Sequence, residues 1–276
     1  MENDLVVNSY INSGSKGVTY LVIYRGEELV MKFVISKKEN FREEENRKII
    51  SPLRKLTHVI PQILPTIIFN IFPIDCLISS ISTLPFIPDQ HDKRFKNINQ
   101  FAYFINKNKD YCLYGIPLEK ADGIFSSVDI YQPNLPTILA NVSFLFELIF
   151  TIYIMHSHNI THNDIYLNVM YKKVDYEREY TFNGEKFYTK YPIMPMLIDF
   201  GNLKLSIPSE TVYSYFLDIH QLKKLIYDRY IKSKRIYQPN KIIYPLYKKM
   251  EQFITKNIKT CLFELLSDET FAPLKI

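Results

Sequence analysis

Glycine, cysteine and tryptophan are scarce in this sequence of 276 residues, which has seven glycines, three cysteines and no tryptophan. The cysteines (Cys76, Cys112, Cys261) are far apart and odd in number, which argues against a disulfide framework and against a zinc knuckle. A reducing compartment fits such a sequence best, so we expect a cytoplasmic protein. Because glycines are few, we expect each one to lie where the backbone needs freedom that other residues lack.

The sequence also lacks a strong excess of one charge and an uninterrupted apolar run, since it is only mildly basic with a formal net charge of +5. Lys and Arg number 34 and Asp and Glu 29, and the charge is spread along the chain, which favours a solvated surface over a nucleic-acid platform. The polar N-terminus (1–4) does not resemble a signal peptide. Prolines interrupt the apolar segment 63–88, while Asn141 and Glu147 lie within 138–155, so we interpret both segments as protein core and predict no membrane span.

The first part of the chain is rich in predicted strands. A helix with apolar residues at every fourth position is expected over 41–56. Residues 58–110 carry prolines and a polar stretch, which suggests irregular structure or an insertion at about 60–110. Apolar, β-branched runs separated by turn residues predict strands over 5–11, 18–24, 29–35 and 111–118.

The remainder is rich in predicted helices. We expect long helices over 136–158 and within 213–266, a hairpin turn at Asn183-Gly184 and a strand over 194–198. The sequence therefore predicts an α+β fold with two lobes. Residues 1–120 would form a small strand-rich N-lobe and residues 121–276 a larger helical C-lobe.

Two features of the first lobe are compatible with phosphate binding. The loop 12–17, which contains Gly14 and Gly17, could cover phosphates, although such loops are usually plain hairpin turns. Lys32 lies in an apolar strand; it is either a solvated edge lysine or a buried cation that needs a carboxylate partner. We predict Glu45 as that partner because it shares the apolar face of the expected helix. Glu43 and Glu44 are the solvated alternatives.

The strongest motif is His162-Asn163-Asp164, which follows the long helix and precedes Asn168. Asp199, followed by Phe-Gly, comes 31 residues beyond Asn168, at the end of a predicted strand. Each string alone occurs by chance in many chains. A lysine in the third strand, Asp and Asn after a long helix, and then Asp-Phe-Gly in that order are hard to obtain by chance.

In this order the motifs resemble those of eukaryotic-type protein kinases over about residues 5–218. The resemblance implies a bilobal protein-kinase-like fold that binds ATP with Mg²⁺, or with Mn²⁺ as an alternative ion. It implies that Lys32 grips the α- and β-phosphates and pairs with Glu45. Asp164 would be the catalytic base, and Asn168 and Asp199 would hold the metal.

The same resemblance extends to the segment after the fourth predicted strand. Residues 118–123 resemble the family's hinge, which implies that Leu118 lines the adenine pocket and that the backbones of Glu119 and Ala121 bind adenine. Gly14 and Gly17 would cover the phosphates. Asp218 resembles the aspartate that braces the catalytic loop, and His156 matches the end of the helix that precedes this loop.

The sequence also departs from the family pattern. Asn163 replaces the arginine of His-Arg-Asp, which argues against activation through a phosphorylated loop. Tyr166 stands where serine/threonine kinases usually carry a lysine near the γ-phosphate. Only three residues separate Asp164 from Asn168, where the family has four. The short segment of 18 residues between Asp199 and Asp218 resembles haspin-like kinases and the divergent kinases of large DNA viruses, which implies a host-cell cytoplasm or a virion.

Three functions remain in competition. The leading hypothesis is a serine/threonine protein kinase with an unknown protein substrate. A small-molecule kinase is the second, because His162-Asn163-Asp164 also resembles the loops of choline kinases and aminoglycoside phosphotransferases. The third is a pseudokinase that acts as a binding module, which Tyr166 and the shortened loop suggest.

Overall fold

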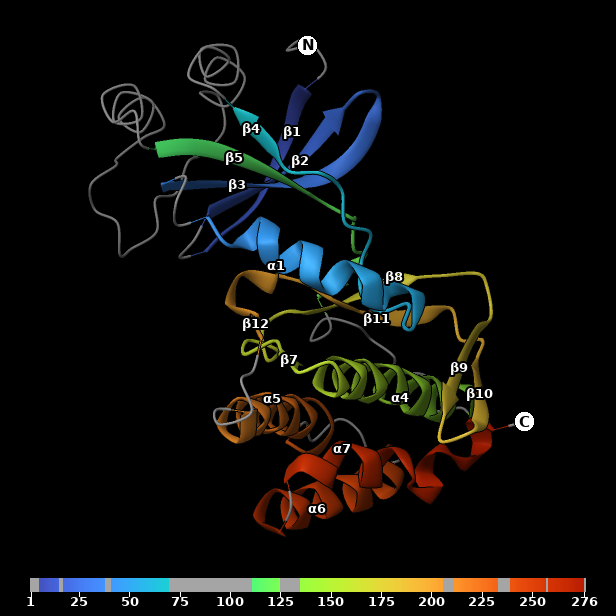
Figure 1. Ribbon diagram of the computed structural model, residues 1–276. Helices are drawn as coiled ribbons and strands as arrows, with labels where there is room; N and C mark the ends of the chain where they lie inside the picture. Colours follow the sequence, from blue (N-terminus) through green and yellow to red (C-terminus); the bar gives the residue numbers. More distant parts are fainter. Residues whose placement is uncertain are drawn as a thin grey trace. The chain divides into compact units, whose positions relative to one another are not determined.

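The computed structural model describes residues 5–14, 17–37, 41–69, 111–124, 135–205, 211–232, 239–256 and 258–275 (Figure 1). The chain forms two compact units: unit 1 comprises Met1–Glu44 and Gln62–Lys120, and unit 2 comprises Glu45–Pro61 and Ala121–Ile276. The boundary after Lys120 coincides with the predicted one. The segment 45–61 corrects the prediction, since it belongs to unit 2 and not to the N-lobe.

Unit 1 contains a five-stranded antiparallel sheet with the strand order β1-β2-β3-β5-β4. The tight turn between β2 and β3 has positive φ angles at Arg25 (53°) and Gly26 (81°), the backbone of a type I′ hairpin. The predicted strands are confirmed, and the last has the predicted ends. The strands are β1 (Leu5–Gly14), β2 (Gly17–Tyr24), β3 (Glu27–Lys37), β4 (Ile67–Phe69) and β5 (Tyr111–Leu118).

The helix predicted over 41–56 is shorter than expected. Helix α1 spans Glu43–Ile50 and continues as the 3₁₀ helix η2 (Ser51–Lys55). Pro52 explains the change, because proline has no backbone N–H to continue the α-helical ladder and its ring clashes with the preceding turn. An insertion was expected at about 60–110, and residues 70–110 of it lie outside the described part of the chain.

Unit 2 is built around helix α4 (Leu135–Ser157), which packs against strand β11 and helices α6 and α7 (Figure 1). By length and composition alone the stretch Leu139–Ser157 could cross a membrane, yet 72% of its apolar window is buried inside the protein. This burial is typical of a core helix, as predicted. The other apolar segment, 63–88, lies largely outside the described residues.

Three small sheets accompany α4. Strand β8 (Val169–Lys173) pairs with β6 (Gly123–Ile124) and with β11 (Ile193–Leu197), while β7 (Ile160–Thr161) pairs with β12 (Lys204–Leu205). Strands β9 (Arg178–Phe182) and β10 (Glu185–Thr189) form the predicted hairpin. Asn183 (φ 50°) and Gly184 (φ 78°) provide its turn, as expected for Asn-Gly.

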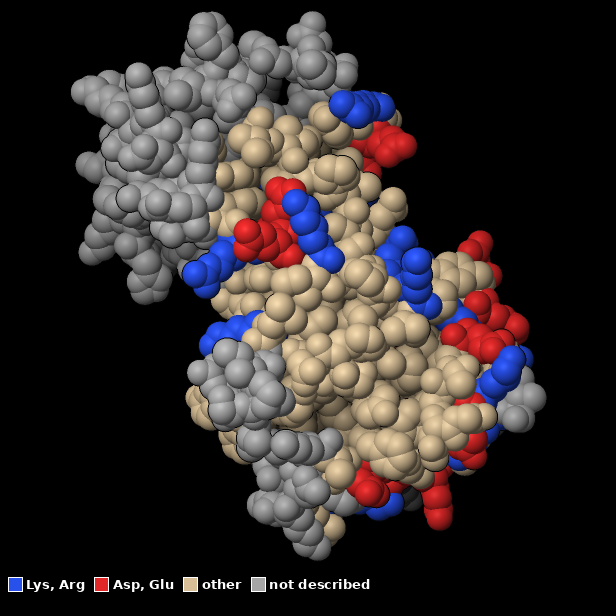
Figure 2. All heavy atoms as spheres, in the orientation of Figure 1, with Lys and Arg blue, Asp and Glu red and all other residues tan. Residues whose placement is uncertain are grey.

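The C-terminal part is helical, as predicted. Helix α5 (Thr211–Ile226) ends in a π-helical turn (Tyr227–Ile231), and α6 (Pro239–Lys256), α7 (Ile258–Leu266) and the 3₁₀ helix η6 (Glu269–Leu274) follow. With separate antiparallel sheets and helices, the chain is an α+β protein. On the face drawn in Figure 2, basic and acidic side chains of the described residues are intermixed.

Candidate functional site

In unit 1, the side chain of Lys32 forms a buried ion pair. Its Nζ lies 3.2 and 3.1 Å from the two carboxylate oxygens of Glu43, and the side chains are only 10% and 7% exposed. Lys32 is in the middle of β3, opposite Thr19 of β2 and Ile116 of β5. Because β3 is a central strand and the Lys32 side chain is buried, Lys32 is not a solvated edge lysine.

The prediction that Glu45 pairs with Lys32 is wrong. Glu45 is exposed, and Glu43, which was taken as a solvated alternative, makes the contact. The predicted face repeats every four residues from Phe41, but α1 begins only at Glu43. Its buried positions are therefore Glu43, Arg47 and Ile50, a spacing of four and then three residues that places Glu45 on the opposite side.

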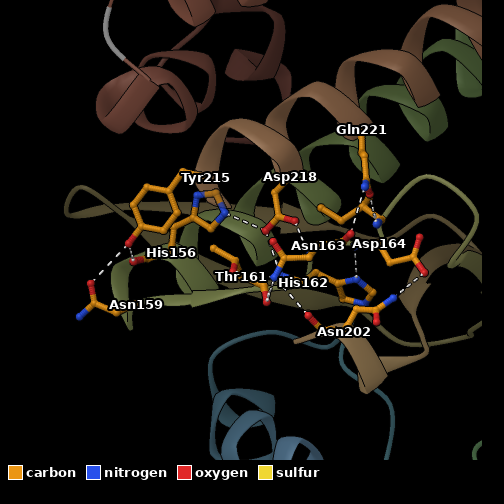
Figure 3. Close-up of polar contacts among 11 residues, drawn as sticks. His156, Asn159, Thr161, His162, Asn163, Asp164, Asn202, Tyr215, Asp218 and Gln221 are labelled. Carbon is orange, nitrogen blue, oxygen red and sulfur yellow. Dashed lines mark hydrogen bonds and ion pairs between the residues drawn. The ribbon is translucent and has the colours of Figure 1, made fainter. Parts of the chain in front are cut away.

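In unit 2, the loop that contains Asp164 is fixed by a buried carboxylate from α5. Asp218 is fully buried; its Oδ2 accepts a hydrogen bond from the backbone N–H of His162 (2.9 Å) and its Oδ1 one from that of Asn163 (2.7 Å) (Figure 3). Oδ2 also lies 3.0 Å from Nε2 of His156 at the end of α4. Asn163 has a left-handed backbone (φ 62°), which asparagine tolerates better than most residues.

The ring of His162 ties this loop to the strand that precedes Asp199. Its Nε2 lies 2.9 Å from the carbonyl oxygen of Ile198, and its Nδ1 accepts the backbone N–H of Asp164 at 3.3 Å. An accepting Nδ1 means that Nε2 carries the proton and donates it to Ile198. Burial lowers the pKa of His162, while Asp218, the carbonyl of Ile198, Asp199 and Asp164 act in the opposite direction. His162, with one ring nitrogen donating and the other accepting, is therefore a neutral imidazole that links the backbone of Asp164 to that of Ile198.

Asn168 closes the short loop and lies beside the strand end that carries Asp199. Its side-chain Nδ2 donates to the carbonyl of Asp164 (2.7 Å), and its backbone N–H donates to the carbonyl of Ile165 (3.0 Å). Strand pairing places Leu197 opposite Val169, and the N–H of Ile198 donates to the carbonyl of Asn168 at 3.0 Å. Three intervening residues therefore suffice to bring Asp164, Asn168 and the strand end at Asp199 together.

Asp199 has a constrained backbone conformation. Its backbone is left-handed (φ 58°, ψ 73°), and its carboxylate accepts the N–H of Gly201 at 3.3 Å. Such a backbone costs a residue with a Cβ about 1–2 kcal/mol and is concentrated at functional sites. The carboxylate of Asp199 and the amide oxygen of Asn168 are hard oxygen donors, which suit Mg²⁺ because this ion keeps several waters and needs few protein ligands. No group of three or more His, Cys, Asp or Glu side chains poised for a metal occurs among the described residues.

Two residues of this network were not predicted from the sequence. Asn202 donates to Asp164 Oδ2 at 3.1 Å, and its own carbonyl accepts from Asn163 at 3.1 Å. The side-chain oxygen of Gln221 accepts the backbone N–H groups of Ile165 and Tyr166, and its Nε2 donates to the carbonyl of Asn163 (Figure 3). The position of Gln221 three residues after Asp218, on the same face of α5, is the signal that could have identified it.

The side chain of Tyr166 points to the end of α5. Its hydroxyl donates to Asp228 at 2.6 Å, and the Lys224 ammonium lies 4.1 Å from the centre of its ring. The hydrogen bond to Asp228 is the main cause that raises the pKa of Tyr166. Lys224 thus contributes a cation next to the position where the resemblance led us to expect a lysine.

The residues that resemble the hinge and the glycine loop lie at the ends of strands or just after them. Leu118 ends β5, the Glu119 carboxylate accepts the N–H of Gln62 at 2.6 Å, and Ala121 begins the second segment of unit 2. Gly14 and Gly17 face each other at the ends of β1 and β2, and the two residues between them lie outside the described part of the chain.

Gly123 of β6 has a steric role in unit 2. A Cβ at this position would lie 2.7 Å from the ring of Tyr171, so the tyrosine ring would have to shift to admit any other residue.

Comparison of the sequence with protein-family models and with curated proteins finds no match. The function of the chain has to be inferred from the chemistry of these residues.

Proposed function

We propose that this chain is an ATP-dependent protein kinase that transfers the γ-phosphate of ATP to Ser or Thr hydroxyls. The observation that carries the proposal is the linked arrangement of Asp164, Asn168 and Asp199 in unit 2. The amide of Asn168 bonds the carbonyl of Asp164, and its backbone carbonyl accepts the N–H of the residue before Asp199. A base and two oxygen donors for Mg²⁺ are the parts that phosphoryl transfer requires.

Each residue has a defined role in this proposal. Asp164 accepts the proton of the acceptor hydroxyl as that oxygen bonds the γ-phosphorus and the bond to the ADP oxygen breaks. Asp199 and Asn168 would hold Mg²⁺, which would neutralise charge on the phosphates. Lys32, kept in place by Glu43, provides a cation for the α- and β-phosphates. Gly14 and Gly17, Leu118, and the backbones of Glu119 and Ala121 would complete the nucleotide site.

The decisive assay is the incorporation of labelled phosphate from ATP into protein. Wild type should label itself or a mixed protein substrate with Mg²⁺ or Mn²⁺. Asp199→Ala and Asp164→Ala should each reduce the rate at least a hundredfold, because each removes a group needed in the transition state. Thr181→Ala, at an exposed position of β9, is the matched control and should keep the wild-type rate. Absence of transfer by wild type to any protein would refute the proposal.

A small-molecule kinase is distinguished in the same assay. Helix α5 begins at Thr211, soon after Asp199, so the segment between them is short. A short segment leaves little chain on which a peptide substrate could dock, which favours a small acceptor. If amino alcohols or aminoglycosides stimulate ADP release by wild type and proteins do not, the acceptor is a small molecule. Loss of this release in Asp164→Ala would show that the same base serves it.

The contacts of Tyr166 are the observation that favours a pseudokinase. A tyrosine engaged with Asp228 occupies the position of the family's lysine. A pseudokinase would show an ATP-dependent thermal shift in wild type, whereas the transfer rate would equal that of Asp164→Ala. Wild-type transfer well above that of Asp164→Ala would exclude it.

A further inference from the structure

Asn202 donates a hydrogen bond to the candidate catalytic base, although it has no place in the kinase motifs that the sequence contains. Its Nδ2 lies 3.1 Å from Oδ2 of Asp164, across a sequence separation of 38 residues (Figure 3). A carboxamide N–H only donates, so it can hold an ionised carboxylate in one direction without competing for the proton that this carboxylate must accept.

The backbone around Asn202 is held by its neighbours. Its carbonyl accepts the side-chain N–H of Asn163 at 3.1 Å, and the same amide nitrogen lies 3.0 Å from Oγ1 of Thr161. The next residue but one, Lys204, pairs with Thr161 in the β7–β12 ladder. The segment after Asp199 is therefore attached to the loop of Asp164 by strand pairing and by two asparagine side chains.

We propose that Asn202 is a positioning residue for Asp164 and that Asn163 keeps it in place. In this arrangement Asn202 restrains one carboxylate oxygen of Asp164 and so sets the direction in which the other can meet the acceptor hydroxyl. Both asparagines are uncharged and already in contact, so the catalytic loop is assembled without phosphorylation of the chain. This inference rests on the proposed function, because it assigns a role within phosphoryl transfer.

Kinetics of Asn202 variants test the catalytic role. Asn202→Ala should lower kcat about tenfold, the loss expected for one partly solvated hydrogen bond to a charged group, and leave the KM for ATP unchanged. Asn202→Ser retains a shorter donor and should recover part of the rate. Asn202→Asp places a second carboxylate beside Asp164 and should lose more than the alanine variant. Thr181→Ala should match wild type.

A measurement independent of activity tests the contact itself. In a double-mutant cycle of thermal unfolding, Asn202→Ala should lower the midpoint in the wild-type background and by clearly less in the Asp164→Ala background. Equal shifts in the two backgrounds would show that the side chains do not interact and would overturn the inference.

The kinetic and the unfolding experiments together distinguish failure of the Asn202 inference from failure of the proposed function on which it rests. Active wild type with an unchanged kcat in Asn202→Ala would overturn the role of Asn202 and leave the kinase proposal intact. Wild type that transfers phosphate to no acceptor would refute the kinase proposal, and the catalytic role of Asn202 with it, even where the unfolding cycle shows coupling.

Discussion

At the scale of single residues, the ion pair between Lys32 and Glu43 has the most direct consequence for stability. Both side chains are about nine-tenths withdrawn from water, and each provides the charge that compensates the other. Removing one partner leaves a buried charge without its counterion, which is usually more costly than the loss of the attraction itself.

We expect Glu43→Gln to lower the free energy of unfolding by about 3 kcal/mol, because it leaves the Lys32 ammonium buried beside a neutral amide. Glu45→Gln is the matched control and should change it by less than about 0.5 kcal/mol, since Glu45 is exposed. Urea denaturation of the three proteins measures both values. Similar losses in the two variants would contradict the assignment of Glu43.

His162 leads to a prediction about pH. Its pKa is lowered by burial, whereas in the unfolded chain it titrates near its ordinary value of 6.5. Below this pH the unfolded state binds a proton that the folded state does not bind, so stability should fall as the pH decreases from 7.5 to 5.5. One such group contributes a slope of up to about 1.4 kcal/mol per pH unit.

The variant His162→Gln should therefore have a flatter dependence of unfolding free energy on pH than wild type. It should not be flat, because burial also lowers the pKa of His58. Denaturation curves at several pH values measure the two slopes, and parallel curves would show that His162 does not carry the effect.

The sequence singled out Lys32, Asp164, Asn168 and Asp199 through short motifs, and the structure places Asn168 in contact with both Asp164 and the residue before Asp199. Glu43 could not be chosen over Glu45 from the sequence, because the buried face of α1 depends on where the helix begins. The predicted start at residue 41 differs by two residues from the observed start at Glu43. Asn202 was missed for a different reason, because its contact joins positions 38 residues apart and no local pattern records such a pairing. Gln221 was missed because its spacing of three residues from Asp218 on α5 was not used as a signal.

At the scale of elements, the β9–β10 hairpin is attached to α4 through a buried carboxylate. Glu147 is fully buried, and its Oε1 accepts hydrogen bonds from Arg178 Nε (2.6 Å), the Tyr180 hydroxyl (2.9 Å) and the Thr189 hydroxyl. Burial raises the pKa of Glu147, and Arg178 opposes this rise. The hairpin joins β8 to β11, so its attachment supports the strands beside Asn168 and Asp199.

We expect Arg178→Met to cost about 3–5 kcal/mol of unfolding free energy, because the carboxyl of Glu147 stays buried without its cation. The double variant Glu147→Leu/Arg178→Met should recover at least half of this loss, since apolar side chains of similar volume can replace a buried ion pair. Chemical denaturation of both single variants and the double variant measures the coupling. A double variant as unstable as the sum of the single ones would contradict it.

Strands and turns were predicted well at this scale because their signals are local. A nearly continuous apolar run marks β5, and Asn183-Gly184 marks the β9–β10 turn. Helix α1 was predicted too long because the apolar spacing outweighed Pro52 in the prediction. The π-helical turn that places Asp228 near Tyr166 has no sequence signal that we could use.

At the scale of the whole molecule, the segment 45–61 is separated in sequence from the rest of its unit. Ile50, Val59 and Ile60 are fully buried. The N–H of Leu197 donates to the carbonyl of Val59 (3.0 Å), and the Thr57 and Thr151 hydroxyls are 2.6 Å apart. The change from predicted strands to predicted helices, together with the resemblance of 118–123 to a hinge, led us to expect the boundary at 120. The inclusion of 45–61 in unit 2 depends on contacts between distant residues, which these local patterns do not reveal.

We expect a fragment of residues 121–276 to be loosely packed, because it lacks these contacts. Addition of a peptide of residues 45–61 should restore a cooperative thermal transition and the near-ultraviolet circular dichroism of packed tyrosines. The same peptide with Ile60→Asp should restore neither, because it would bury a charge. A fragment that melts cooperatively without any peptide would refute this dependence.

The early position of this segment has a consequence for synthesis. The ribosome releases Ile50, Val59 and Ile60 long before Thr151 and Leu197, at a rate of about 5–20 residues per second. For several seconds these apolar side chains have no surface of their own unit to cover them. The nascent chain therefore exposes a short apolar segment that a chaperone can bind. Unit 2 completes its core only when most of the protein has been translated.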